Sequence, residues 1–152
     1  MCSHTTTTVR LHSFRGAKAD ADEAAKLAIA VGEPVFRICN VLSLTEEPII
    51  FDPITIPQAL FTGLTLARCR DRSNTIFHLY QTEFGITVVR SAERLRGVVA
   101  DADSAKMLRV SMAAPLLEIR RVALSFDNAP AEYRRSLVNT ANYEYFSDLA
   151  KT

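Results

Sequence analysis

The chain has 152 residues, of which 48% are hydrophobic, so it is long enough to bury the core of a single domain. Its 18 basic and 17 acidic residues nearly cancel, which argues against a domain that binds nucleic acid through a broad basic surface. The three cysteines, Cys2, Cys39 and Cys69, are not closely spaced and favour neither a disulfide framework nor a zinc site. We therefore expect no metal and no cofactor.

The N-terminal residues lack the pattern of a signal peptide, and no apolar run approaches the roughly 20 residues of a membrane span. We expect a soluble cytoplasmic protein without a membrane partner. The unpaired thiols fit a reducing compartment.

The first predicted elements are a strand and a short helix. Residues 1–8 are polar and aperiodic, so we interpret them as a tail or linker remnant, and we expect the domain to span 9–150. The β propensity of residues 5–14 predicts a strand that begins within them and ends at Arg15-Gly16. From Asp20, apolar residues at helical spacing predict an amphipathic helix that Gly32 stops.

Two β-rich runs follow, at 34–44 and 49–56. The turn-forming group 45–48 separates them, so they predict an antiparallel hairpin. Residues 57–72 are mixed in character, and only a helical turn near 58–61 is expected there.

An apolar stripe beginning at Ile76 predicts a helix that ends at Gly85. Ser73, Asn74 and Thr75 precede it and are all candidate N-caps. Because a helix N-terminus exposes N–H groups, these three residues are also candidates for contact with an anionic ligand group.

A long strand is predicted over 86–100, although 92–95 also fits a helix. Asp101 is a suitable N-cap for a short helix over 102–108. Arg90 begins a basic run along the strand and is a candidate for reaching a pocket.

The last predicted element is a second hairpin, with strands over 116–126 and 132–138 and turn chemistry at 127–130. Its second strand has two distinct faces, with Glu132, Arg134 and Ser136 on one and Tyr133, Arg135 and Leu137 on the other. Two hairpins imply antiparallel pairing, so the sequence predicts an α+β fold rather than a doubly wound parallel sheet.

The segment LLEIRRVALSFDNAPAEYRRSLVNTANYEY resembles the end of the UTRA domain, the effector-sensing half of HutC/FarR-type GntR transcription regulators. The matching residues are Leu116, Leu117, Ile119, Arg121, Pro130, Glu132, Tyr143 and either Tyr145 or Phe146. Further matches lie upstream at 32–35, Pro48, Ile56-Pro57, 76–85 and 102–108.

The resemblance implies a chorismate-lyase-like antiparallel sheet with flanking helices, a small-molecule effector and a homodimer. An exposed edge strand within 88–98 is our candidate for the dimer surface. Regulators of this family carry a winged helix-turn-helix before the sensor. The sequence before Val9 is too short to hold one, so we expect DNA contact only through an N-terminal domain that is absent from this chain.

The resemblance also assigns ligand contacts. Two arginines that commonly grip a phosphate in the family correspond to Asn40 and Leu42 here, so bidentate guanidinium recognition is lost at this position. Asp52 and Glu132 match carboxylate positions of the family. A strand hydrogen bond for Asn40 and a core position for Leu42 are equally good interpretations.

Two cations remain near these positions. Arg121 matches the strand arginine of the family, and Arg134 either anchors a ligand carboxylate or pairs with Glu132 on the same face. Val138 replaces an aromatic residue and makes the wall more apolar. A carboxylate-bearing or largely apolar effector is therefore expected rather than a phosphosugar.

Three functions fit these observations. The first is a ligand sensor that shifts a regulator between two states. The second is an enzyme related to chorismate lyase with Glu132 as the acid, but we expect no enzymatic activity because no nucleophile or second base is recognisable. The third is a dimerisation module with a vestigial pocket.

Overall fold

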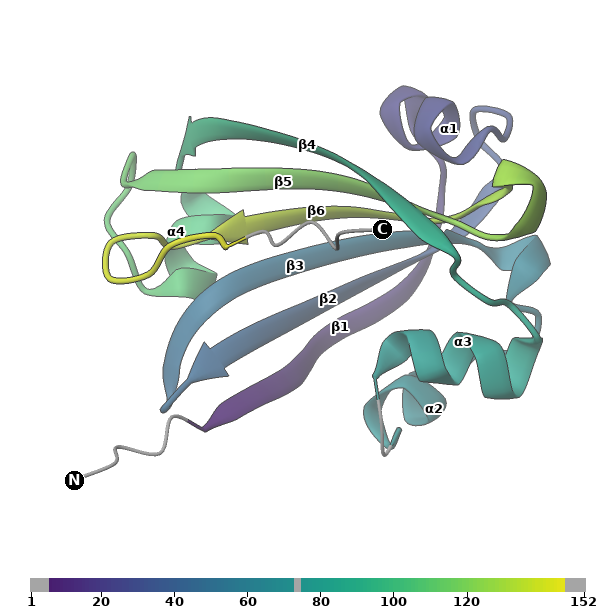
Figure 1. Ribbon diagram of the computed structural model, residues 1–152, viewed down its shortest axis with the longest axis horizontal. Coiled ribbons are helices and arrows are strands. Elements are labelled where there is room, and N and C mark those ends of the chain that lie inside the picture. The colour runs from purple at the N-terminus through teal and green to yellow at the C-terminus, as the bar shows by residue number, and fades with distance from the viewer. Residues whose placement is uncertain (1–5, 73–74, 147–152) are drawn as a thin grey trace, which may run out of the picture.

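The computed structural model describes residues 6–72 and 75–146. They form a six-stranded sheet in the order β1-β2-β3-β6-β5-β4 in which all neighbours are antiparallel (Figure 1). The strands are β1 Thr7–Lys18, β2 Pro34–Leu44, β3 Glu47–Pro57, β4 Arg90–Val99, β5 Pro115–Leu124 and β6 Pro130–Val138. The helices are α1 Ala21–Leu27, α2 Leu66–Arg70, α3 Ile76–Phe84 and α4 Ala102–Leu108, with 3-10 turns η1 Gln58–Leu60 and η2 Phe126–Asn128. The predicted antiparallel α+β fold is confirmed.

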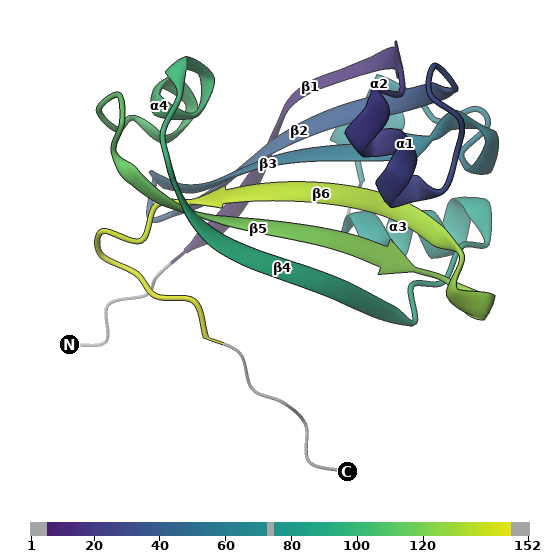
Figure 2. The ribbon, with the colours of Figure 1, turned by 90° about the horizontal axis from the view of Figure 1, so that it is seen from above.

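Helices cover both faces of the sheet. On one face, which we call the α3 face, Ile38 and Ile54 pack against side chains of α2 and α3, including Tyr80. On the other, the α1/α4 face, α1 packs beside Val35 and α4 packs against Leu137. Figure 2 shows α1 and α4 at opposite ends of the strands. No helix in the described ranges is long and apolar enough to cross a membrane.

The two predicted hairpins meet at the centre of the sheet. Thr45 and Glu46, with φ values of 47° and 68°, form the two-residue turn between β2 and β3. β6 then pairs with β3, placing Arg134 opposite Ile54. The predicted alternation along β6 is confirmed, because Glu132 bonds to Tyr80 in α3 while Tyr133 bonds to Asp22 in α1.

Several element boundaries differ from those predicted. β1 continues through Gly16 to Lys18 because β2 pairs with it over that whole length. α1 ends well before Gly32, at Leu27, where Ala28 takes a left-handed conformation that turns the chain so that Ile29 N donates to Ala24 O at 3.1 Å. The helix α2, capped by Thr65, was not predicted.

The end of α3 requires a left-handed residue, as the sequence predicted. Gly85 has φ of 66°, and its N–H donates to Gln81 O at 3.1 Å. A Cβ at Gly85 meets nothing within 4 Å, so the cost of a side chain comes from the backbone alone.

We expect Gly85→Ala to lower the free energy of unfolding by about 1 kcal/mol, because alanine is disfavoured in the left-handed region. Gly97→Ala is the matched control, since its Cβ also has open space and Gly97 lies in β4 without a positive φ. Urea denaturation of both variants measures the difference, and equal effects would contradict this account of the helix end.

Candidate effector site

A cluster of buried charges lies on the α3 face where β3 and β6 run side by side. Arg134 in β6 donates through Nε to Glu132 Oε1 at 2.9 Å and through Nη2 to Oε2 at 3.1 Å. Its Nη1 reaches Asp52 Oδ2 in β3 at 2.9 Å. Glu132 is 0% exposed and the Arg134 side chain is 14% exposed, so these charges are held largely away from water.

Neutral and aromatic side chains surround the ion pairs. The Tyr80 hydroxyl in α3 donates to Glu132 Oε2 at 2.6 Å, and the Ser136 hydroxyl donates to Asp52 Oδ1 at 2.6 Å. The Phe77 ring of α3 lies 5.5 Å from the Arg134 guanidinium carbon, within the range of a cation–π contact. α3 therefore closes one side of the cluster.

The cluster carries more negative than positive formal charge. Two carboxylates share one guanidinium, and burial raises the pKa of Asp52 above its usual value despite the charge of Arg134. Beside them on β2, Asn40 is buried, and its Oδ1 finds no donor within the described residues. Asn40 and Asp52 are paired across β2 and β3, so the unpartnered oxygen lies beside the charged cluster. An unsatisfied buried acceptor favours a partner that carries a hydrogen-bond donor.

Removing the bond between Tyr80 and Glu132 tests how far the stability of this cluster depends on α3. We expect Tyr80→Phe to lower the free energy of unfolding by about 1–3 kcal/mol, since a buried carboxylate oxygen loses a donor. Tyr143→Phe, which removes a longer bond of 3.3 Å to Glu47, is the control and should leave urea denaturation unchanged. Equal losses in the two variants would contradict a special role for the buried bond.

The structure brings four of the sequence-predicted residues into direct proximity: Asn40, Asp52, Glu132 and Arg134. Leu42 lies two residues along β2 from Asn40 and is half-buried.

The other candidates lie at the margins of the cluster or away from it. Val138 is buried beside Tyr143, in the segment that follows β6. Thr75 caps α3 by accepting from His78 N at 3.2 Å, and Ser73 and Asn74 lie outside the described residues.

Arg121 is ion-paired with Glu93 of β4 at 2.7 Å. Arg90 is exposed and donates to Asn128 near the β5–β6 turn, so it does not reach the cluster.

Sequence reasoning missed the aromatic side of this site. Phe77 and Tyr80 lie on the predicted apolar stripe of α3, and nothing in that periodicity distinguishes a hydroxyl that bonds to a carboxylate from an ordinary core residue. Ser136 was on the correct face of β6, but its bond to Asp52 depends on the pairing of β3 with β6.

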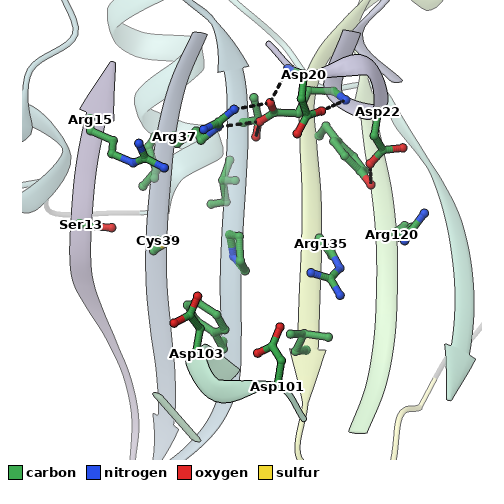
Figure 3. Close-up of a pocket in the computed structure, with 18 residues that line it drawn as sticks. Ser13, Arg15, Asp20, Asp22, Arg37, Cys39, Asp101, Asp103, Arg120 and Arg135 are labelled. Carbon is green, nitrogen blue, oxygen red and sulfur yellow. Dashed lines mark hydrogen bonds and ion pairs between the residues drawn. The ribbon is translucent and has the colours of Figure 1, made fainter. Parts of the chain in front are cut away.

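The opposite face of the sheet carries a cavity of about 440 Å³ between α1 and α4. Figure 3 shows Arg120 and Arg135 on one side, Arg15 and Arg37 on another, and Asp101 and Asp103 at the α4 end. Phe51 and Pro53 are among the residues that line it. The sequence did not predict this cavity, because only the folded sheet places α1 and α4 at the two ends of one face.

Residues 3–144 match the family described as the UTRA domain. The chain belongs to the UTRA domain family. Among solved structures, this UTRA domain is similar to the ligand-binding domain of a protein assigned to the GntR family of transcriptional regulators, from Bordetella bronchiseptica. The TM-score is 0.91 at 32% identity, over 97% of this chain and 93% of that one. The C-terminal domain of Yurk from Bacillus subtilis shares the fold, with a TM-score of 0.85 at 20% identity over 90% and 93% of the two chains.

Two curated relatives from Escherichia coli K12 also resemble the UTRA domain. One is named for transcriptional repression of the fructoselysine utilization operon and is 27% identical over 105 residues, 69% of this chain and 42% of that protein. The other, the mannosyl-D-glycerate transport/metabolism system repressor MngR, is 22% identical over 120 residues, 79% of this chain and 49% of that protein. The chain thus spans less than half the length of each. The family expected from the sequence is confirmed.

Proposed function

We propose that this UTRA domain is the effector-sensing part of a GntR-family transcription regulator, without enzymatic activity of its own. A small molecule bound on the α3 face alters DNA binding by a separate winged-helix domain. One observation carries this assignment: Asp52, Glu132 and Arg134 form a buried charged cluster next to an Asn40 oxygen that has no donor among residues 6–72 and 75–146. Such a cluster is costly to fold and is typical of a recognition site.

The chemistry of the cluster favours an effector that donates hydrogen bonds. The sequence suggested a carboxylate-bearing or largely apolar effector because Arg121 and Arg134 were expected to be available. Both arginines are instead ion-paired with carboxylates of the same sheet. Among the described residues of this cluster, the buried atom left without a partner is the Asn40 oxygen, which is an acceptor, so we propose a ligand that presents a hydroxyl or ammonium group to Asn40 beside Asp52. The names of the two curated relatives each contain a sugar unit, and sugar hydroxyls supply such donors.

The regulator is proposed to act as a homodimer in the cytoplasm. Effector binding would shift the population between two arrangements of the dimer and so change the spacing of the paired DNA-binding domains relative to operator half-sites. The candidate dimer edge is β4, whose residues are mostly exposed.

A thermal-shift screen of the purified chain tests the assignment. The panel contains amino sugars, neutral sugars and polyols, amino acids, simple carboxylates, fatty acids and phosphosugars. We expect a hit among the donor-bearing compounds, and the hit should be weakened by Asn40→Ala and by Glu132→Gln. Asn40→Ala is the sharper variant, because removing an oxygen without a partner should leave the stability of the free protein unchanged or slightly raised.

Arg70→Ala is the control for the screen, since Arg70 lies at the surface and is ion-paired with the neighbouring Asp71. A hydroxyl- or ammonium-bearing hit that is unaffected by Asn40→Ala would contradict the proposed site, and hits confined to simple carboxylates and fatty acids would contradict the proposed ligand class. Silence across the panel would favour the dimerisation module, and release of pyruvate from chorismate would favour the enzyme.

A further inference from the structure

A second charged cluster lies on the α1/α4 face, around Glu118 of β5. Glu118 is 0% exposed, yet three arginines from three adjacent strands donate to it through Nε. The distances are 3.0 Å from Arg96 in β4, 2.8 Å from Arg120 in β5 and 2.7 Å from Arg135 in β6. Burial by itself raises the pKa of Glu118, but the hydrogen bonds and charges of these arginines outweigh that effect and hold its pKa below the usual value.

This arrangement carries an excess of positive charge. One ionised carboxylate neutralises one of the three guanidinium groups, and each arginine uses only one of its five N–H donors on Glu118. The side chains of Arg96, Arg120 and Arg135 are 64%, 30% and 41% exposed. A single arginine would satisfy the charge of Glu118, so neutralising it does not explain why three surround it.

Two of the three arginines border the cavity between α1 and α4. Arg120 and Arg135 are directly opposite each other in the pairing of β5 with β6, and both line the cavity (Figure 3). Like charges at such positions repel, and their shared bond to Glu118 holds them in place. Paired guanidinium groups fixed in this way suit a carboxylate or phosphate group, which accepts from several donors at once.

The acidic side chains of the cavity are largely engaged with other groups. Asp20 and Asp101 cap α1 and α4, Asp22 accepts from the Tyr133 hydroxyl at 2.8 Å, and Glu23 is ion-paired with Arg37 at 2.7 Å. Asp103 also lines the cavity from α4. With five carboxylates and four arginines among its lining residues, the cavity has no net positive charge, so the attraction for an anion is local to Arg120 and Arg135 and favours one anionic group rather than a polyanion.

We propose that Arg120 and Arg135 bind one carboxylate or phosphate group of a small molecule in the α1/α4 cavity, at a site separate from the effector site on the α3 face. The rest of the ligand lies over Phe51, Pro53 and Leu137, which line the same cavity. Arg96 orients Glu118 from outside the cavity. The domain thus has two ligand sites on opposite faces of one sheet, and the second stands whether or not the proposed effector site is correct.

NMR titration of the unmodified chain provides the first test. Inorganic phosphate and acetate are titrated separately, with sodium chloride at matched ionic strength as the baseline, while the arginine Nε–Hε resonances are followed. We expect saturable shifts of the Arg120 and Arg135 resonances with at least one of the two anions and smaller shifts for Arg96. Shifts with acetate alone, or with phosphate alone, identify which anionic group the site prefers. Linear shifts of all three resonances, indistinguishable from those in chloride, would overturn the proposal.

Matched substitutions provide the second test. Arg120→Gln and Arg135→Gln should each weaken anion binding about tenfold or more, because each removes charge-assisted hydrogen bonds to the ligand. Arg96→Gln also removes an arginine bond to Glu118, but Arg96 does not line the cavity. This variant should therefore change the affinity for the anion less than about threefold. Equal losses in all three variants would overturn the proposal in favour of general attraction to the basic surface. Thermal melts of each variant identify any that fail to fold, and the titration of the unmodified chain does not depend on them.

Discussion

Replacing Arg134 with alanine is expected to lower the free energy of unfolding by about 3–5 kcal/mol, because two buried carboxylates lose the cation that compensates them. Glu132 is fully buried and, of the contacts made within the described part of the chain, keeps only its bond from Tyr80, while Asp52 keeps only its bond from Ser136. Urea denaturation followed by circular dichroism measures the loss. Arg68→Ala is the control, since Arg68 pairs with Glu83 at the surface, where the side chains are 47% and 41% exposed. This control should change stability by less than about 1 kcal/mol.

A second variant separates lost charge compensation from lost packing against Phe77. In the double substitution Glu132→Gln and Arg134→Ala, one buried charge is removed while the loss of packing is the same as in Arg134→Ala, so the stability that returns relative to Arg134→Ala reflects charge compensation. A loss below about 1 kcal/mol in Arg134→Ala would contradict the buried cluster. It would mean that water already compensates the charges of Asp52 and Glu132.

Elements governed by local chemistry were predictable from the sequence. Thr75 and Asp101 cap α3 and α4 through their own side chains, and Gly85 ends α3. The two faces of β6 followed from its alternation, because side chains along a strand point to opposite faces in turn, and burial of one face then fixes the position of every other side chain. Family resemblance then pointed to Asn40, Asp52 and Glu132, which the sheet places close together.

What the sequence did not predict depends on contacts between distant segments. Arg134 was expected either to bind a ligand carboxylate or to pair with Glu132. The actual outcome, in which Asp52 shares it, follows from the pairing of β3 with β6. The cluster of arginines around Glu118 likewise needs β4, β5 and β6 side by side. Sequence spacing carries no information about these long-range pairings.

The end of α1 shows the same limit at short range. Gly32 was the obvious stop, but the chain turns at Ala28, a residue with no particular preference for the left-handed region. The segment after it is tied to β1 and β2, where Gly32 N donates to Ala19 O at 2.8 Å and Ala19 N donates to Glu33 O at 2.9 Å. Tertiary hydrogen bonds therefore set the length of this helix.

The ion pair beneath α1 predicts how acid affects stability. Arg37 donates to both oxygens of Glu23, at 3.0 Å through Nε and 2.7 Å through Nη2, and the Thr55 hydroxyl donates at 2.6 Å. Burial alone would raise the pKa of Glu23, but these bonds and one from the Asp20 backbone lower it from 4.5 to about 2. The unfolded chain therefore takes up a proton at Glu23 before the folded chain does, so falling pH favours unfolding.

The resulting contribution is roughly 3 kcal/mol, at about 1.4 kcal/mol per unit of pKa. It is fully present above about pH 5 and is lost as the pH falls towards 2. Glu23→Gln should therefore be less stable than the unmodified chain by about this amount at pH 6, and the two should converge near pH 2. Urea denaturation at several pH values measures this difference. Glu46→Gln, which alters an exposed carboxylate in the β2–β3 turn, is the control and should follow the unmodified chain throughout. The difference in the free energy of unfolding between Glu23→Gln and the unmodified chain could instead stay constant from pH 6 to pH 2. That result would show that Glu23 stabilises α1 through packing and neutral hydrogen bonds rather than through its charge.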